Sequence, residues 1–374
     1  MKDRIIREAE RILPELIDDI KDICSYDSRK DKPEDNHPYG KRISICLEEA
    51  LKKAERLGFK TLNVENRVGI AMNEVGSEDY IACVGHLDVV DINGTWKTDP
   101  FVCSEINGRL FARGVLDNKG PIFSCLYALK VLKNLNYDFP IDVQIIFGTD
   151  EESGMDDMKW YFKDHKYPLM GFTPDCKYPV VYAERGRAQF VYRISKDYFA
   201  EYLSFMNEYI LNQNDLAVSL GVDYADEEFG KNQVRKIELL DDNDDLLISL
   251  VSSYPASYSL EQMKESLSKN CSEHMRLELV SNLDPVFFEK DSYLIKKLEE
   301  AYEEIMDDDG KAVTTTGGTY AKVVKNIVPF GPSFKGQKGI GHLPNEWMDI
   351  EDIKKNTQIY AYALYKLMEG LKDA

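Results

Sequence analysis

The apolar residues near the N-terminus recur at the spacing of one helix face. Ile5, Ala9, Ile12, Leu16 and Ile20 follow one another at intervals of three or four residues. This period predicts an amphipathic first helix, and the same kind of spacing returns further along the chain. The helices predicted outside the middle of the chain cover residues 2–24, 43–57, 120–134, 155–164 and 293–306.

Short apolar runs separate these helical segments. Residues 61–64, 68–72, 80–84 and 142–147 have the length and composition of strands. Strands that alternate with helices of these lengths indicate an α/β sheet with helices on both faces. In such sheets, ligands bind beyond the carboxyl ends of the strands.

The pattern changes after about Gly186. Strands and helices alternate in a different order there, with a hairpin around the acidic run 241–245. With one further strand near residues 216–220, the order approximates a ferredoxin-like α+β domain. The predicted strands are 189–194, 235–240, 246–252 and 275–279, and the predicted helices are 198–211 and 260–267.

Side chains of the types that bind metals follow the expected strand ends. His86 stands in the buried-strand pattern Ala82-Cys-Val-Gly-His-Leu-Asp-Val-Val90, and the acidic triplet 150–152 follows the run 143–148. Two histidines and several carboxylates at strand ends and at Gly or Pro turns are the ligand mix of Zn²⁺ or a similar divalent ion. The candidate set is His86, Asp117, Asp150, Glu151, Glu152, Asp175 and His342.

The order of these motifs resembles that of the co-catalytic zinc peptidases of the aminoacylase/carboxypeptidase clan. Within the clan, the chain is most similar to the PepV-like dipeptidases. The resemblance rests on Gly85-His-Leu-Asp-Val-Val90, Trp96-x-x-Asp-Pro-Phe101, Gly148-Thr-Asp-Glu-Glu-Ser153 and Gly317-Gly-Thr-Tyr320. It implies a catalytic domain with a mixed sheet, formed by residues 1–186 and 290–374, and a smaller ferredoxin-like lid domain inserted at 187–289.

The resemblance also implies a role for each candidate residue. His86, Asp117 and Asp175 would hold one metal ion, and His342, Asp117 and Glu152 the other, so that Asp117 bridges. Glu151 would be the general base, and the Asp88 carboxylate would orient the His86 imidazole. Gly317, Gly318 and Thr319 would line the substrate cleft, where glycine allows close approach of the backbone. The Asp117–Asn118 peptide bond is expected to be cis.

The chain departs from the family pattern in the expected lid. The strand ending near Ile194 leads almost directly into a helix, without the family's oxyanion-stabilising histidine. Ser253 stands where the family carries an arginine that binds the substrate carboxylate, and the candidate replacement cations are Arg185, Arg187 and Lys335. The insertion is also much shorter than the two-part lid of PepV-like dipeptidases. Loss of one oxyanion donor typically costs about 10²–10³ in rate.

The bulk properties narrow the function further. The net charge of -19, from 47 basic and 66 acidic residues, disfavours nucleic-acid and anionic-membrane partners. Seven cysteines without paired spacing indicate a reducing cytoplasm. We therefore expect a cytoplasmic dipeptidase or aminopeptidase, monomeric or homodimeric, acting on small peptides with two Zn²⁺ ions, Mn²⁺ or Co²⁺ being alternatives. The other interpretations are an N-acyl-amino-acid amidohydrolase and a metal-binding relative with weak or no peptidase activity.

Overall fold

The computed structural model describes residues 1–334, 337 and 339–371. It divides into two compact units, which are described separately. The first comprises Met1–Tyr182, Glu289–Val313 and Thr319–Ala374, and the second comprises Ala183–Phe288 and Thr314–Gly318. The assignment of a catalytic role to residues 1–186 and 290–374 and of a lid role to residues 187–289 remains a prediction.

The first unit is built on a six-stranded mixed sheet with the order β1-β2-β6-β3-β7-β18. Strands β6, β3, β7 and β18 run parallel, whereas β1, β2 and β6 pair antiparallel. Every residue of β3 is buried, which is why this strand has a continuous apolar run instead of alternation. The strands are β1 Lys60–Val64, β2 Val68–Asn73, β6 Asp142–Gly148, β3 Tyr80–His86, β7 Met170–Thr173 and β18 Ile327–Pro329.

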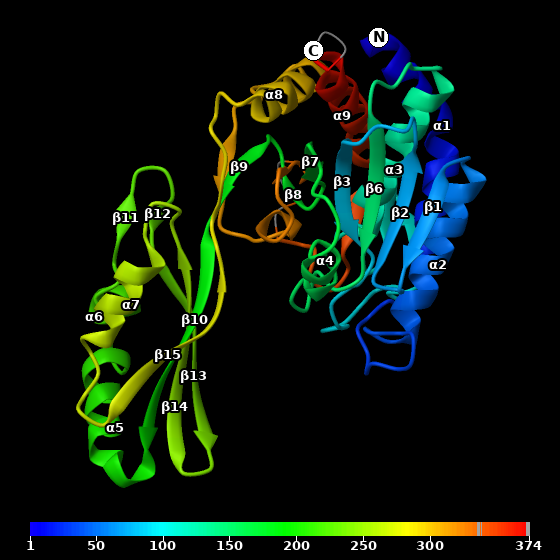
Figure 1. Ribbon diagram of the computed structural model, residues 1–374. Helices are drawn as coiled ribbons and strands as arrows, with labels where there is room; N and C mark the ends of the chain where they lie inside the picture. Colours follow the sequence, from blue (N-terminus) through cyan, green and yellow to red (C-terminus); the bar gives the residue numbers. More distant parts are fainter. Residues whose placement is uncertain (335–336, 338, 372–374) are drawn as a thin grey trace. The chain divides into compact units, whose positions relative to one another are not determined.

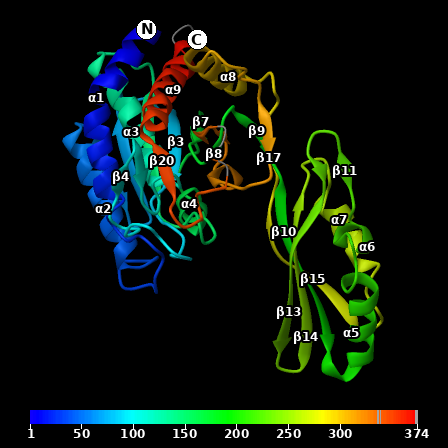
Figure 2. The ribbon, with the colours of Figure 1, turned by 180° about the vertical axis from the view of Figure 1, so that it is seen from behind.

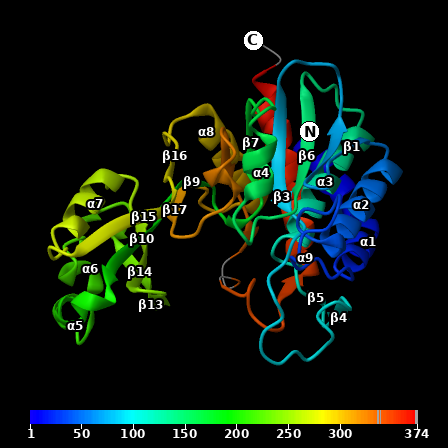
Figure 3. The same cartoon turned by 60° about the horizontal axis from the view of Figure 1, so that its bottom comes forward.

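Helices cover both faces of this sheet (Figure 1). Helix α3 packs against β3 and β6, and α1 and α9 pack in turn against α3. These helices face the viewer in Figure 2, and Figure 3 shows α4 on the opposite side of the sheet from α1 and α3. The helices are α1 Lys2–Ile23, α2 Lys41–Arg56, α3 Lys119–Asn134, α4 Asp156–Tyr161, α8 Tyr293–Met306 and α9 Ile350–Glu369.

Helix α9 is an element that the sequence pattern did not predict. Its residues 356–364 are all buried, and they include the polar residues Asn356, Thr357 and Gln358. A helix that is buried on all sides has no polar stripe, so it lacks the periodicity that identifies surface helices. The helix predicted at residues 155–164 is present but shorter, as α4.

Smaller strand pairs complete the molecule. The pairing of β20 with β5 joins the segment that follows His342 to the segment that precedes Asp117. The order β16-β9-β17 forms a further small sheet, in the part of the chain where it passes between the two units. These strands are β4 Ser104–Ile106, β5 Arg109–Phe111, β8 Cys176–Lys177, β9 Val181–Glu184, β16 Val286–Phe287, β17 Val313–Thr315, β19 Pro332–Ser333 and β20 Trp347–Asp349.

The second unit is an antiparallel four-stranded sheet with the order β13-β14-β10-β15, the order of a ferredoxin-like fold. Phe190, Tyr192, Ile248 and Leu250 form its core together with residues of the covering helices, such as Met263. The elements are β10 Gly186–Ser195, α5 Phe199–Phe205 with a π-helical continuation at Met206–Ile210, α6 Leu216–Ser219, β11 Ala225–Asp226, β12 Gly230–Lys231, β13 Gln233–Asp242, β14 Asp245–Tyr254, α7 Leu260–Ser268 and β15 Met275–Leu283.

The strand predicted near residues 216–220 is wrong, because this segment is the short helix α6. The Asp215 carboxylate accepts hydrogen bonds from the backbone N–H groups of Ala217 and Val218, which caps the helix. The buried residues of the segment, Ala217 and Leu220, stand three apart, the spacing of a helix face. The fold therefore needs no strand there, since the four strands of the sheet come from the other predicted segments.

Among the described residues, no helix combines the length and the apolar character that a membrane crossing requires.

Candidate dinuclear metal centre

Three parallel strands bring the candidate residues to one edge of the sheet. His86 is the last residue of β3 and pairs with Gly148, the last residue of β6. Strand β7, on the other side of β3, ends at Thr173, two residues before Asp175. Because parallel strands end at a common edge, the loops that follow β6 and β7 flank the His86 ring.

The Asn118 amide ties the segment that carries Asp117 to this edge. Its Oδ1 atom accepts the backbone N–H of His86 at 3.3 Å, and its Nδ2 atom donates to the Pro174 carbonyl at 2.6 Å. Asn118 also precedes the first residue of α3. The Asp117–Asn118 peptide bond is cis, as the family resemblance implied.

The two carboxylate oxygens of Asp117 face two different histidines. Oδ1 lies 3.2 Å from Nε2 of His86, and Oδ2 lies 3.0 Å from Nε2 of His342. Nε2 of His342 also lies 3.0 Å from Oε1 of Glu152. Nε2 of His86 lies 3.7 Å from Oδ2 of Asp175. A carboxylate with one oxygen toward each imidazole has the geometry of a bridging ligand.

The donor atoms form two compact groups within the part of the chain that the structure describes. His86, Asp117 and Glu152 make one group, and His86, Glu151 and Asp175 make the other. Within each group, the donor atoms lie within 4.8 Å of one another. Five predicted ligands and the predicted base therefore come together at one place.

The residue Asp88 supports the centre in a way that differs from the prediction. The Nδ1–H group of His86 donates to the Asp88 backbone carbonyl at 2.9 Å, which directs Nε2 toward Asp117. The Asp88 carboxylate lies 3.4 Å from the same Nδ1 atom. It accepts the backbone N–H groups of Glu151 and Glu152, at 3.2 and 3.0 Å. Asp88 thus holds the acidic loop as well as the imidazole.

A second buried carboxylate, Asp157, holds the start of the same loop. Its Oδ2 atom accepts the backbone N–H groups of Thr149 and Asp150 and the hydroxyl of Tyr320, at 2.7, 3.1 and 2.5 Å. Burial raises the pKa of Asp157 from 3.8 to about 7. Lys30 donates to the Asp150 carboxylate at 2.6 Å. Asp150 is therefore an ion-pair partner within the loop.

The electrostatics of the centre reflect its crowded charges. Hydrogen bonds to Asp117 and Glu152 raise the pKa of His342 to about 11. Burial would raise the pKa of Asp117, but hydrogen bonds from His342 and His86 hold it well below its usual range. Burial and the Asp175 charge raise the pKa of Glu151 well above its ordinary value, and burial and Asp117 raise that of Glu152. This excess of carboxylates in a small volume is the donor chemistry that suits cations.

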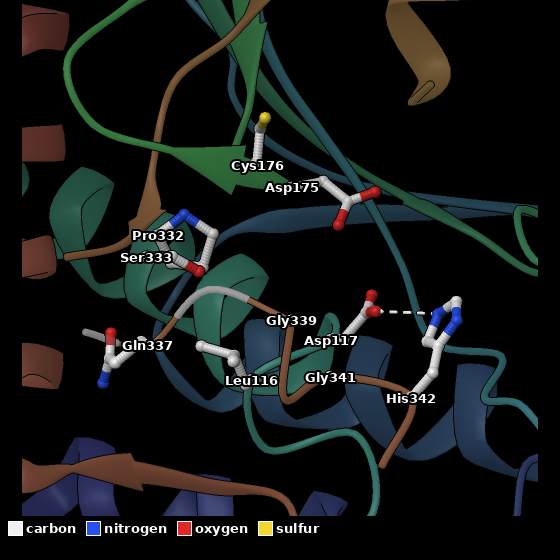
Figure 4. Close-up of a pocket in the computed structure, with 10 residues that line it drawn as sticks. All are labelled: Leu116, Asp117, Asp175, Cys176, Pro332, Ser333, Gln337, Gly339, Gly341 and His342. Carbon is white, nitrogen blue, oxygen red and sulfur yellow. Dashed lines mark ion pairs between the residues drawn. The ribbon is translucent and has the colours of Figure 1, made fainter. Parts of the chain in front are cut away.

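A cavity of about 320 Å³ opens next to Asp117, Asp175 and His342. Figure 4 shows the ion pair between Asp117 and His342 at one end and Pro332 and Ser333 at the other. The parallel pairing of β8 with β19 sets Cys176 beside Pro332 in the wall. The cavity is large enough to admit a small organic molecule.

The residues predicted to line the substrate cleft are consecutive in the chain, and the boundary between the two units falls among them. Gly317 and Gly318 are exposed and belong to the second unit, whereas Thr319 is buried and belongs to the first. The Thr319 hydroxyl accepts the backbone N–H of Ala321, so it caps a turn. None of the three lines the described cavity, and their role in substrate binding stays a prediction.

The cations proposed to replace the lid arginine differ in their surroundings. Arg185 is buried and donates to the backbone carbonyls of Phe229, Lys231 and Ser253, so its guanidinium is engaged within the second unit. Arg187 is exposed on β10, opposite Ser253 on β14. Lys335 lies outside the described residues.

Sequence reasoning missed the residues that organise the centre from behind, Asp157 and Glu346. Both carboxylates are completely buried. Asp157, in α4, follows the acidic triplet, and Glu346 stands four residues after His342, but acidic side chains are usually exposed. Their proximity to the motifs was the available signal.

The model of peptidase family M20/M25/M40 matches residues 82–366 of this chain. The chain belongs to this family. It is therefore a hydrolase, and the α/β fold with its mixed sheet is the fold of the family's metallopeptidases.

A curated relative covers nearly the whole chain. The Bacillus subtilis (strain 168) protein named "Putative dipeptidase YtjP" is 26% identical over 461 positions, which cover 97% of this chain and 98% of the relative. Because the chain has only 374 residues, at least 87 of these 461 positions have no counterpart in it. The relative thus contains insertions that this chain lacks.

Solved structures share the fold at low sequence identity. The dipeptidase Dug1p from Saccharomyces cerevisiae is 13% identical, with a TM-score of 0.73 and coverage of 99% of both chains. The YXEP protein of Bacillus subtilis, described as a dinuclear metal binding peptidase, is 14% identical, with a TM-score of 0.64. The match spans 96% of this chain and 99% of the YXEP protein.

Proposed function

We propose that this chain is a metal-dependent dipeptidase or aminopeptidase that binds two divalent ions, with Zn²⁺ as the expected metal. One observation carries the proposal: the two oxygens of Asp117 face Nε2 of His86 and Nε2 of His342 separately. A carboxylate that binds a single metal ion would not have to direct its two oxygens toward two different imidazoles. Asp175 and Glu152 supply a further carboxylate on each side.

The residues present fit a pair of divalent ions. Imidazole nitrogens and carboxylate oxygens are the ligands that Zn²⁺ takes in catalytic sites. Both Nε2 atoms face carboxylates, and in His86 the proton is directed to Nδ1 by the Asp88 carbonyl, which leaves Nε2 as a donor to a metal. His86, Asp117 and Asp175 would hold one ion, and Asp117, Glu152 and His342 the other.

Glu151 is the residue proposed to move the proton. Its carboxylate lies in the donor group with His86 and Asp175, and its backbone N–H is fixed by Asp88. When bound, the two ions supply a more acidic water and a polarised carbonyl. Glu151 would accept a proton from the attacking water on a carboxylate oxygen and return it to the departing amine. Asp88 prevents the loop from shifting away from the reacting atoms.

Short peptides are the proposed substrates. The relative named as a dipeptidase covers the chain almost completely, and its name supports this substrate class. The motifs also favour the PepV-like dipeptidases among the family. An N-acyl-amino-acid amidohydrolase would use the same chemistry in a differently shaped pocket. We further propose that residues 187–289 act as a shortened lid, that the enzyme is cytoplasmic, and that it is a monomer or a homodimer.

The test is an activity assay of the zinc-loaded full chain. Dipeptides, tripeptides and N-acyl amino acids with matched side chains would be compared by kcat/KM, with Mn²⁺ and Co²⁺ loading in parallel. We expect the highest kcat/KM for dipeptides with a free amino group. Preference for N-acyl amino acids would establish the amidohydrolase instead. Absence of hydrolysis of all three classes with every metal would refute the proposed activity.

A further inference from the structure

A buried ion pair joins the two segments that carry Asp117 and His342. Nη1 of Arg113 lies 2.8 Å from Oε2 of Glu346, and the side chains of the two residues are 1% and 0% exposed. Arg113 precedes Asp117 by four residues, and Glu346 follows His342 by four. The pairing of β5 with β20, Phe111 opposite Trp347, aligns the same two segments directly beyond the ion pair.

Glu346 holds the backbone that leads to Asp117. Its Oε1 atom accepts the N–H groups of Leu116 and Asp117, at 2.8 and 3.1 Å. Its Oε2 atom accepts the N–H of Gly114 at 3.1 Å, in addition to the Arg113 guanidinium. Each oxygen therefore receives two donors. A neutral amide could not replace this carboxylate, because its NH₂ group would face two donors with no acceptor.

Arg113 holds the backbone that leads to His342. Its Nη1 atom donates to the Gly341 carbonyl at 2.5 Å, and its guanidinium lies over the Trp96 ring at 5.1 Å. Gly341 is so close to the centre that an added Cβ atom would lie 2.7 Å from Oδ2 of Asp117. One nitrogen of the guanidinium, Nη1, thus donates both to Glu346 and to the carbonyl of the residue directly before His342. The other, Nη2, donates to the Asp91 carbonyl at 3.4 Å.

We propose that Glu346 and Arg113 are positioning residues that fix Asp117 and His342 relative to one another and thereby set the affinity of the metal site that these two share. Neither residue is among the proposed ligands, and each acts through backbone groups. The inference rests on the proposed dinuclear centre. The ion held by Asp117 and His342 would then depend on the Arg113–Glu346 ion pair behind these ligands, because residues that hold metal ligands in place commonly affect the affinity for the metal.

The deciding experiment measures metal affinity in the full chain. Wild-type protein and Glu346→Gln would be stripped of metal, checked for folding by circular dichroism and thermal melting, and titrated with Zn²⁺ against a chelating dye. We expect the weaker Zn²⁺ equivalent of Glu346→Gln to lose roughly 10–100-fold in affinity, the usual cost of losing an outer-shell partner. A Co²⁺ titration followed by its visible spectrum reports the same loss without an activity assay.

Asp19→Asn is the matched control, because Asp19 is also a buried carboxylate with cationic partners. It is 3% exposed and bonds to Lys53, Arg56 and Tyr127, away from the proposed ligands. The control should lower the melting temperature and leave both Zn²⁺ affinities unchanged. Equal weakening by Asp19→Asn would show that general loss of stability explains the effect, which overturns the proposal.

Arg113→Lys covers the case in which Glu346→Gln does not fold. Lysine keeps the charge but has a single nitrogen on a more flexible stem. It therefore loses the Nη2 contact to Asp91 and the guanidinium plane over Trp96, and it holds Glu346 and the Gly341 carbonyl less rigidly. We expect a smaller loss in the same equivalent. Wild-type affinities in the folded variants would overturn the proposal. If the wild type binds only one ion, the dinuclear centre fails as such, and weakening or constancy of that ion in the variants still decides the positioning role.

Discussion

The buried polar groups of the two units bind different parts of the chain. In the first, buried carboxylates such as Asp88, Asp157 and Glu346 accept backbone N–H groups of the loops that carry the proposed ligands. In the second, the core is formed by apolar and aromatic side chains, with Phe190 and Met263 completely buried. The buried carboxylates of the first unit thus fix loops that carry proposed ligands, whereas the buried Arg185 guanidinium of the second unit donates to backbone carbonyls of that unit.

The chain departs from its family in the second unit more than in the first. The first unit holds every predicted metal ligand in one cluster. The second unit has its ferredoxin-like fold but carries Ser253 where the resembled family has an arginine, and no histidine directly after Ile194. A sheet tolerates such exchanges because its stability comes from packing, whereas a metal centre tolerates few.

Glu151→Gln should produce the largest effect and locate the chemistry in the first unit. The amide has the shape of the carboxylate but cannot carry a proton. We expect kcat to fall by about 10²–10⁴-fold, the usual contribution of a general base. Metal content, measured by elemental analysis, should stay at the wild-type level. If Glu151→Gln instead loses metal together with activity, Glu151 is a ligand and the assignment of the base is wrong.

Phe190→Ala and Phe147→Ala form a matched pair that tests whether the units serve different purposes. Both phenylalanines are completely buried, one on β10 and the other on β6. Each substitution should cost about 3–5 kcal/mol of stability in its own unit. Phe147→Ala should also weaken metal binding, because β6 leads into the Glu151 loop. Reduced metal affinity in Phe190→Ala, measured by chelator competition, would contradict this division.

Asp157 should give the metal-free first unit a characteristic pH dependence. Its pKa is about 7 in the folded protein and 3.8 in the reference state, so the folded chain retains this proton longer as pH rises. The resulting stabilisation is complete below about pH 4, and between there and pH 7 the free energy of unfolding falls by about 1.4 kcal/mol for each step of one in pH. Asp157→Asn keeps an oxygen for the three donors and should flatten this slope. If the free energy of unfolding, measured against pH, has the same slope in the wild type and in Asp157→Asn across this range, Asp157 does not have this role.

The smallest expected effect concerns the second unit and the substrate carboxylate. Because Ser253 stands in place of the family's arginine, we expect only a weak preference for a dipeptide over its C-terminal amide. A charged hydrogen bond contributes about 1.5–3 kcal/mol, so the preference should be compressed by roughly 10–100-fold. The ratio of kcat/KM for several such pairs measures it. A strong preference for the free carboxylate would point to another cation, and Arg187→Ala, at an exposed position, would be the first variant to test.

Much of the architecture could be predicted from the sequence because its patterns are local. The run from Tyr80 to His86 and the stripe of α1 follow directly from buried strands and a one-sided helix. The prediction was wrong for residues 216–220, which form a capped helix. Helix α9 was not predicted, because it is buried on all sides and has no polar stripe.

The ligand types of the centre could also be predicted, but its supporting contacts could not. His86 and Asp117 stand in recognisable motifs. The backbone hydrogen bonds of Glu346 join segments more than 200 residues apart, with Leu116 230 positions away. Such contacts depend on how the loops fold, and no spacing within one motif encodes them.

The number of metal ions that one chain binds decides whether the centre is dinuclear. Asp117 faces both His86 and His342, so we expect two ions that share this carboxylate. Elemental analysis of the zinc-reconstituted full chain should approach two ions, and His342→Ala should retain about one. A maximum of one ion in the wild type, or the same content in His342→Ala as in the wild type, would contradict a dinuclear centre shared by Asp117.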